Sequence, residues 1–317
     1  MPGRSRTTAS RRCSRTPESR WLGRIAFAIA LAALPAAARE TAAPINTPTL
    51  WRALRANGDE AFYLIGSVHL GRRSLWRYPR AIDDAYRRSA ELVLETGADE
   101  LRPEVVTRLA LRYARIAPPA TLRDRVSPAT IAELSRFLGA RRDSLTPYLQ
   151  MEPWFVAQQI EAREAQRTGL DAEFGIDRHF ASRAAREKPV VGLETAESQM
   201  QVLAWLPRAT QEELLRDAIE RTRDAHNGSE GVARAWASGD DRELERIIYR
   251  AMSESPALNT YYQRMLIGRN ESMAQRLASL ARDGKLRFVV VGVGHMVGER
   301  GIPTLLRDYG FRVDRVR

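Results

Sequence analysis

Two runs of apolar residues constrain the fold of this chain more than any other feature. Phe288-Val289-Val290-Val291 and Val190-Val191 show no alternation between apolar and polar positions. A strand that is apolar on both faces must be covered on both faces, which is typical of central strands in α/β proteins. The runs therefore predict a sheet with helices on each side, and 317 residues are enough to bury such a core.

The spacing of apolar residues places this sheet at the two ends of a helical region. Residues 50–54 and 61–68 flank the turn residues Asn57-Gly58, which predicts a β-hairpin. Further strands are predicted at 91–95, 189–194, 287–293 and 311–316. Helical spacing covers 79–89, 101–116, 127–138, 153–168, 175–187, 195–206, 210–226, 240–252, 257–283 and 301–309. The predicted fold class is α/β: a central mixed β-sheet flanked by helices, with a large helical insertion at approximately 100–285.

The first 38 residues have the pattern of an export signal. Seven arginines precede a short apolar run at 25–34, and small residues follow up to Ala38. We expect a signal peptide at 1–38, a mature domain at 39–317, and a periplasmic or secreted protein. An uncleaved anchor or a wrongly assigned start are the alternatives. The run is too short to span a bilayer, and no further membrane span is expected.

Net charge alone, at +11, would suggest a nucleic-acid partner. Seven of the 50 basic and one of the 39 acidic residues lie in 1–38, so the remainder carries 43 against 38, a net of +5. Outside the leader there is no basic stripe interleaved with aromatic residues and no nucleic-acid-binding motif. We therefore expect no nucleic-acid partner. The single cysteine, Cys13, lies in the leader, which excludes a disulfide framework or a cysteine-rich metal site in the mature domain.

Polar residues gather where the predicted strands end. Gly66-Ser67-Val68-His69 and Gly292-Val293-Gly294-His295 are two copies of Gly-x-x-His, and two other strands end in Glu95 and Glu194. In open α/β sheets, ligands bind in the crevice beyond the carboxyl ends of the strands. Strands that run in one direction would therefore aim two imidazoles and two carboxylates into one crevice.

This set of side chains suits a divalent metal ion. Two neutral imidazoles and one carboxylate, His69, His295 and Glu95, leave open positions on a catalytic zinc, manganese, iron or cobalt ion, which the sequence does not distinguish. The second carboxylate, Glu194, or Glu95 itself, could act as general base. The alternative is that each histidine is a surface residue or a hydrogen-bonded anchor.

The remaining candidates have stronger structural interpretations. His179 lies in a predicted helix beside Phe180, and His226 lies at a helix end, so packing or capping is expected for both. Asp177 begins a helix, where an acid stabilises the helix dipole. Arg269-Asn270 interrupts a long helical stretch, and either positions substrate or forms a surface pair.

The order of these motifs resembles the TraB/GumN family, which is related to the animal Tiki proteins, over residues 49–316. The blocks that carry the resemblance are Tyr63–His69, Pro79, Glu95, Gly175-Ile176-Asp177, Lys188–Thr195 with Gln199, Arg269-Asn270, Val291–Gly298 and Gly301-Ile302. The resemblance implies an α/β fold with paired Gly-x-x-His motifs and metal-dependent hydrolysis. It places the site on His69, Glu95 and His295, supported by Glu194, Arg269 and Asn270. Val293 departs slightly, standing where a smaller residue is common.

What the family implies about substrates differs between its members. Tiki proteins are described as metal-dependent proteases, TraB is associated with shutdown of a peptide pheromone, and GumN occurs with exopolysaccharide genes. We expect an exported metal-dependent hydrolase acting on a peptide or protein substrate, with Arg269 and Asn270 positioning substrate or stabilising an oxyanion. The alternatives are a non-catalytic envelope protein that binds haem or another ligand through its histidines, and an accessory protein of exopolysaccharide production.

Overall fold

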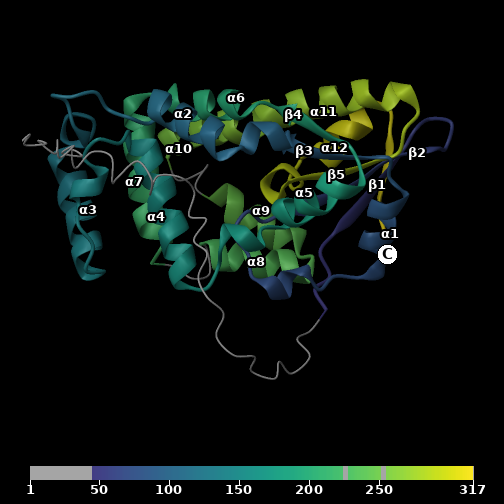
Figure 1. Cartoon of the computed structure of the whole chain (residues 1–317), viewed down its shortest axis with the longest axis horizontal. Helices are drawn as coiled ribbons and strands as arrows, with labels where there is room; N and C mark the ends of the chain where they lie inside the picture. The colour runs from purple at the N-terminus through teal and green to yellow at the C-terminus, as the bar shows by residue number, and fades with distance from the viewer. Residues whose placement is uncertain (1–44, 224–227, 251–254, 317) are drawn as a thin grey trace, which may run out of the picture. The chain divides into compact units, whose positions relative to one another are not determined.

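The computed structural model describes residues 45–223, 228–250 and 255–316, which contain a six-stranded mixed sheet (Figure 1). The strands follow one another in space in the order β4-β3-β5-β2-β1-β6. Their bounds are β1 Leu50–Leu54, β2 Glu60–Ser67, β3 Glu91–Thr96, β4 Val190–Glu194, β5 Arg287–Gly292 and β6 Arg312–Arg315. β4, β3, β5 and β2 are mutually parallel, whereas β1 is antiparallel to both β2 and β6. The predicted class, hairpin and common strand direction are confirmed.

Helices account for most of the rest of the described chain. Their bounds are α1 Arg80–Arg88, α2 Pro103–Tyr113, α3 Pro128–Ala140, α4 Pro153–Arg167, α5 Ile176–Glu187, α6 Ala196–Ala204, α7 Arg208–Arg221, α8 Ser229–Ser238, α9 Asp241–Tyr249, α10 Pro256–Tyr262, α11 Gly268–Leu280 and α12 Ile302–Asp308. Several begin with proline at the first helical position, where its missing N–H is no loss and its fixed φ already suits a helix. Among the described residues, no helix is long and apolar enough to cross a membrane.

Alternate residues of the central strands enter two separate cores, which explains the unbroken apolar runs. Phe288 and Val290 of β5 pack in one core with side chains of α1, α5, α8 and α9. Val289 and Val291 pack in the other, against α11 and α12. Every residue of this strand is buried because both faces of the sheet are covered by helices.

A third core lies among the helices and contains no strand residue. It joins apolar side chains of α3, α4 and α7, including Leu134, Ile160 and Leu215. These three helices lie together in Figure 1, away from β1 and β2. The helical insertion thus has a core of its own, while α5, from its middle, and α11, from its C-terminal end, pack on the sheet.

The predicted helix over 257–283 is wrong in one respect. Five residues, Gln263–Ile267, form a π-helix between α10 and α11. π-helical turns widen the backbone and occur frequently at functional sites. The sequence also does not predict α8, whose Gly231 and serines lower its helical propensity. The expected signal peptide at 1–38 and His226 lie outside the described residues.

Candidate active site

Four strands run in the same direction, so their carboxyl ends lie together at one end of the sheet. His69 follows β2, and His295 ends a 3₁₀ turn that follows β5. Glu95 is the next-to-last residue of β3, and Glu194 is the last residue of β4. The four side chains predicted at strand ends are therefore neighbours in the fold.

Both histidines direct the same ring nitrogen toward one carboxylate oxygen. His69 Nε2 is 4.0 Å and His295 Nε2 is 3.7 Å from Glu95 Oε1. The same oxygen accepts a hydrogen bond from the Gly292 backbone N–H at 2.5 Å. Glu95 is thus the centre of the site, with one imidazole on each side.

The other nitrogen of each imidazole is held by a polar partner. His69 Nδ1 lies 3.2 Å from Asp177 Oδ2, and His295 Nδ1 lies 2.5 Å from Asn270 Oδ1. Asn270 donates its amide N–H to the Arg300 carbonyl at 2.7 Å, so its oxygen faces His295. Both partners accept hydrogen bonds, which assigns a proton to Nδ1 of each ring and directs each Nε2 toward Glu95.

Arg269 joins the two carboxylates. Its Nη2 lies 2.7 Å from Glu95 Oε2 and 2.8 Å from Glu194 Oε2, and its Nε donates to both Glu194 oxygens. Nη1 donates to the Met265 carbonyl, which belongs to the π-helix. Gln199 Nε2 donates to Glu95 at 3.0 Å and to Glu194 at 3.3 Å. Arg269 and Asn270 are buried and bonded to protein groups, so we assign them positioning roles rather than contact with substrate.

The glycines of the two motifs have distinct steric roles. A Cβ on Gly66 would lie 2.9 Å from the Val293 side chain, so the first motif needs glycine where the second passes over it. A Cβ on Gly292 would lie 2.9 Å from Glu95 Oε1 and 3.2 Å from His69 Nε2. Glycine is therefore needed at position 292 because the carboxylate of Glu95 and the ring of His69 approach its backbone too closely for any side chain.

The surroundings of Glu95 change the pKa of its carboxyl group. Burial raises the pKa of Glu95, but the imidazoles of His295 and His69, the Arg269 guanidinium and the Gly292 N–H outweigh it. Together they hold the pKa of the Glu95 carboxyl well below its usual range, so that Glu95 remains ionised.

The two histidines shift in opposite directions. The Asp177 carboxylate raises the pKa of His69 to about 9, against the opposing effect of desolvation. Burial lowers the pKa of His295 to about 4. The side chain of His69 is 61% exposed, so solvent screens part of its coupling to Asp177. The side chain of His295 is 4% exposed, and its ring stays neutral at neutral pH.

The donor atoms of this site are of the chemical types that bind divalent metal ions. Two imidazole nitrogens and a carboxylate oxygen form a common donor set of catalytic zinc sites, and the ring orientation through Nδ1 partners is the usual second layer of such sites. Two atoms that both lie about 2.1 Å from one ion can be at most about 4.2 Å apart, and both His–Glu95 distances fall within that limit. In the part of the chain that the structure describes, however, no group of three or more His, Cys, Asp or Glu side chains is already arranged around a metal position.

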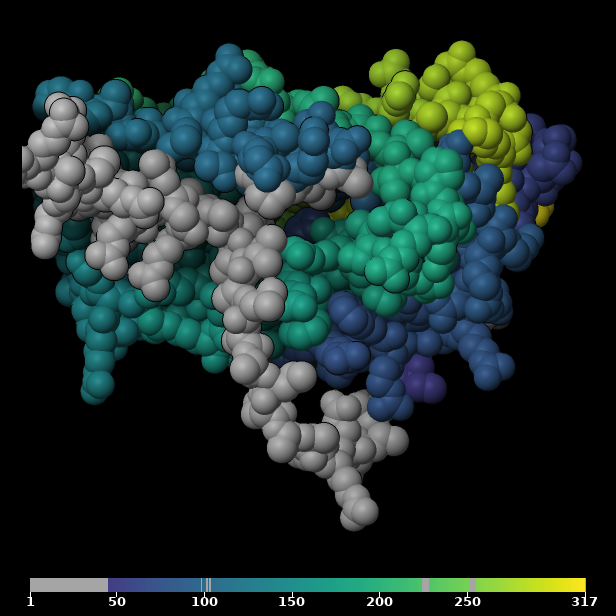
Figure 2. All heavy atoms as spheres, in the orientation of Figure 1, coloured from purple at the N-terminus to yellow at the C-terminus, as the bar shows by residue number. Residues whose placement is uncertain are grey.

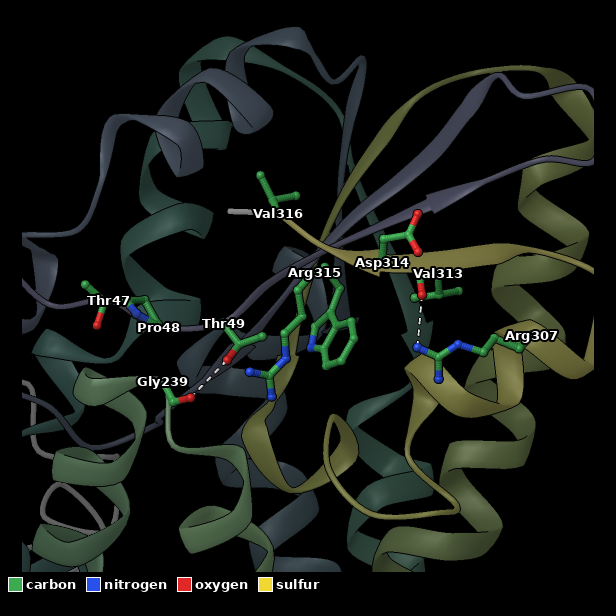
Figure 3. A pocket seen from close by; sticks show the side chains of 10 residues that line it. Thr47, Pro48, Thr49, Gly239, Arg307, Val313, Asp314, Arg315 and Val316 are labelled. Carbon is green, nitrogen blue, oxygen red and sulfur yellow. Dashed lines mark hydrogen bonds between the residues drawn. The ribbon is translucent and has the colours of Figure 1, made fainter.

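One face of the molecule is hollowed. In Figure 2 a hollow opens in the visible face, and purple and yellow atoms from the N-terminal and C-terminal strands lie at its floor. Another depression, of about 780 Å³, lies at the far edge of the sheet and is lined by residues of β1, β6 and the segments beside them (Figure 3). Its lining includes Trp51, Arg307 and Arg315 but none of the strand-end histidines or glutamates. The candidate site is therefore the strand ends, where the donor atoms converge.

Sequence reasoning missed two members of the site. Asp177 does lie in the first turn of α5, but its Oδ2 also contacts His69, so a dipole role alone is an incomplete account. Gln199 bonds both glutamates, a role that its place in the family motif does not predict. His179, in contrast, packs against Trp76 as a structural residue, as expected, and bonds the Tyr78 hydroxyl at 2.8 Å.

Comparison with known proteins agrees with the order of these motifs. The model of the TraB/PrgY/gumN family matches residues 49–315. The chain belongs to the TraB/PrgY/gumN family. Its relatives include the uncharacterized protein YbaP of Escherichia coli K12, with 26% identity over 273 residues, which cover 82% of this chain and 97% of YbaP. YbaP of Shigella flexneri matches to the same extent. No solved structure matches significantly.

Family membership confirms the resemblance to the TraB/GumN family. The matched range includes both Gly-x-x-His motifs, Glu95, Glu194 and Arg269-Asn270. The TraB/PrgY/gumN match therefore covers the complete strand-end site and the helical insertion between the N-terminal and C-terminal strands.

Proposed function

We propose that this TraB/PrgY/gumN protein is an exported, metal-dependent hydrolase that cleaves peptide bonds. The observation that carries the proposal is the approach of His69 Nε2 and His295 Nε2 to the same Glu95 oxygen. A leader with the pattern of an export signal supports action in the periplasm or outside the cell. A peptide substrate is favoured by the family resemblance rather than by a contact in the site.

His69, His295 and Glu95 would hold the metal. A divalent ion in this position supplies Lewis-acid activation of water and of the scissile carbonyl. Asp177 and Asn270 keep a proton on each Nδ1, so that the metal would be bound through Nε2, from which His69 must first lose its second proton. These contacts fix both rings before substrate arrives, which lowers the cost of assembling the site.

The chain's own charges keep Glu95 ready as an anion. Arg269 balances the negative charges of Glu95 and Glu194 in a buried setting, where two unpaired carboxylates would repel each other and take up a proton. Glu194 accepts from Arg269 on both oxygens and so holds the guanidinium, while Glu95 Oε1 lies beside both Nε2 atoms. We therefore assign metal binding to Glu95 and a positioning role to Glu194.

The alternative of a haem-binding protein has no observation in its favour at this site. Axial histidines must face a flat porphyrin from opposite sides, whereas a carboxylate oxygen lies within 4.0 Å of both Nε2 atoms here. An ionised carboxylate between the two imidazoles suits a small cation better than an apolar macrocycle.

The function is tested by hydrolysis of a fluorogenic peptide library by purified protein, with chelator and with zinc, manganese, iron or cobalt added back. We expect cleavage that chelator removes and at least one metal restores. His69→Ala and His295→Ala should both abolish it, while His179→Phe, at a histidine outside the site, should retain it. Cleavage that survives the double substitution of His69 and His295 would contradict the proposal.

A further inference from the structure

The sheet has two edges, and their exposed strands differ in chemistry. β6 has only four residues, of which Arg312, Asp314 and Arg315 are exposed. Charged side chains on a short edge strand discourage pairing with another strand. β4, at the opposite edge, has apolar or glycine residues up to Glu194, and all five of its residues are half-buried. The edge beside the site therefore lacks the charges that protect the distant edge.

The register between β3 and β4 decides which backbone groups of β4 point away from the sheet. Val190 pairs with Leu92, whose N–H donates to the Pro189 carbonyl at 3.0 Å. In a parallel ladder this pattern turns the N–H and C=O of Val191 toward β3 and those of Val190 and Gly192 outward. Within the described ranges, the outward groups of Val190 and Gly192 make no backbone hydrogen bond.

This unpaired edge leads directly into the site. β4 ends at Glu194, whose Oε2 is 2.8 Å from Arg269 Nη2. The same nitrogen is 2.7 Å from Glu95 Oε2. A chain that lay along β4 would therefore pass from Val190 to the carboxylate on which the two histidines converge.

We propose that β4 is the edge that recognises substrate, and that an extended peptide segment pairs with Val190 and Gly192 as a seventh strand. The outward groups repeat about every 6.7 Å along β4, which matches the alternate residues of an extended backbone. Recognition through the main chain selects unfolded peptide segments and tolerates varied side chains. This inference rests on the proposed peptidase function and adds its substrate class.

The test uses a fluorescein-labelled octapeptide of alternating serine and threonine with lysine at each end, bound to the full chain in chelator. Two matched versions carry two N-methyl groups, on alternate amides or on consecutive amides. A strand presents alternate amides to one side, so the alternate version can turn both methyl groups away from β4. We expect fluorescence anisotropy to show affinity within about twofold for the alternate version and at least about tenfold weaker for the consecutive version.

A pair of protein variants tests the other side of the same contact. Val190→Pro removes an outward N–H, whereas Val190→Ala keeps it. We expect Val190→Pro to weaken binding of the unmodified peptide about tenfold and Val190→Ala to change it less than about twofold. If Val190→Pro does not fold, as its melting temperature will show, the methylated peptides decide the question.

The outcomes separate this inference from the proposed function. Equal affinity for the two methylated peptides, or no binding of any of them, overturns pairing at β4 even if the protein hydrolyses peptides. The expected methylation pattern without hydrolysis in any metal retains pairing at β4 and overturns the peptidase proposal.

Discussion

The two Gly-x-x-His motifs place chemically equivalent rings in opposite surroundings. His69 follows β2, is 61% exposed in its side chain, and has a carboxylate partner in Asp177. His295 follows β5, is 4% exposed, and has a neutral amide partner in Asn270. The pKa of the first is raised to about 9 and that of the second is lowered to about 4.

The difference shows that the motif fixes the position of the ring but not its protonation. The Asp177 charge stabilises imidazolium at His69, whereas burial and an uncharged partner favour neutral imidazole at His295. A metal ion requires the neutral ring at both positions, so its binding must displace a proton from His69 at neutral pH. In the proposed metal site, His295 would therefore be ready to bind in its neutral form, and the protonation of His69 would make metal binding depend on pH.

The largest effects should come from removing the rings themselves. His69→Ala and His295→Ala should each lower hydrolysis on the order of 10³-fold, because each removes a donor to the central site. Their stabilities should differ. His295→Ala leaves the buried Asn270 oxygen without its partner and should cost about 1–3 kcal/mol of unfolding free energy. His69→Ala, at an exposed ring whose pairing with Asp177 is screened by solvent, should cost less than His295→Ala.

Denaturant unfolding and peptide hydrolysis together check this prediction. Equal loss of stability in the two variants would contradict the contrast between a buried and an exposed ring. Full activity in either one would contradict the shared role.

The next largest effects should come from replacing Asp177 and Asn270, the residues that contact Nδ1 of the two histidines. Asp177→Asn gives His69 an amide partner like that of His295, so its pKa should fall from about 9 toward the ordinary value. Asn270→Asp should move the pKa of His295 upward. Both changes should reduce metal affinity or activity by about 10–100-fold, since each disturbs a ring that binds the metal.

NMR titration of the histidine rings in chelator measures these shifts. Asp177→Glu serves as the matched control because it keeps the charge. If the titration of His69 is unchanged in Asp177→Asn, the assigned cause of its raised pKa is wrong.

A smaller effect is expected in the pH dependence of stability without metal. The pKa of His69 is raised on folding, so its stabilisation is complete below the unfolded value and is lost as pH rises toward about 9. The pKa of His295 is lowered on folding, so stability falls as pH drops from the unfolded value toward about 4. His69→Gln should flatten the alkaline side of the melting-temperature profile, and His295→Gln the acid side. The reverse assignment of the two sides would refute this account.

The smallest effect is expected from replacing His179, a partly buried histidine outside the candidate site. The pKa of His179 is also lowered to about 4 by burial, but its ring packs among Trp76, Tyr78 and Phe180. His179→Phe should therefore reduce the acid sensitivity of folding, by less than about 1 kcal/mol between pH 7 and pH 4, with no change in metal content. If His179→Phe folds but loses its metal, then His179 is not a purely structural residue and its separation from the proposed metal-binding histidines is wrong.

The sequence predicts the frame of the site because that frame depends on local pattern. Apolar runs place β4 and β5 in the sheet, and parallel strands align Glu95 and Glu194 with the two histidines. The role of Asp177 depends on a contact with His69, 108 positions earlier, that spacing along one helix does not reveal.

The environment of Arg269 could not be predicted for a similar reason. Its residue type is compatible with substrate binding, but its geometry depends on the π-helix at 263–267, whose Met265 carbonyl accepts from Nη1. Helical periodicity predicts an unbroken helix there. Pairing of the guanidinium with Glu95 and Glu194 is a consequence of the tertiary fold.

The central claim is that the two Gly-x-x-His motifs share one metal ion, and metal analysis tests it most directly. Wild-type protein, the double variant His69→Ala/His295→Ala and the control His179→Phe would be purified identically and measured by mass spectrometry of their metal content. The account predicts one metal ion per chain in the wild type and in His179→Phe, and none in the double variant. Equal metal content in the wild type and the double variant would contradict it.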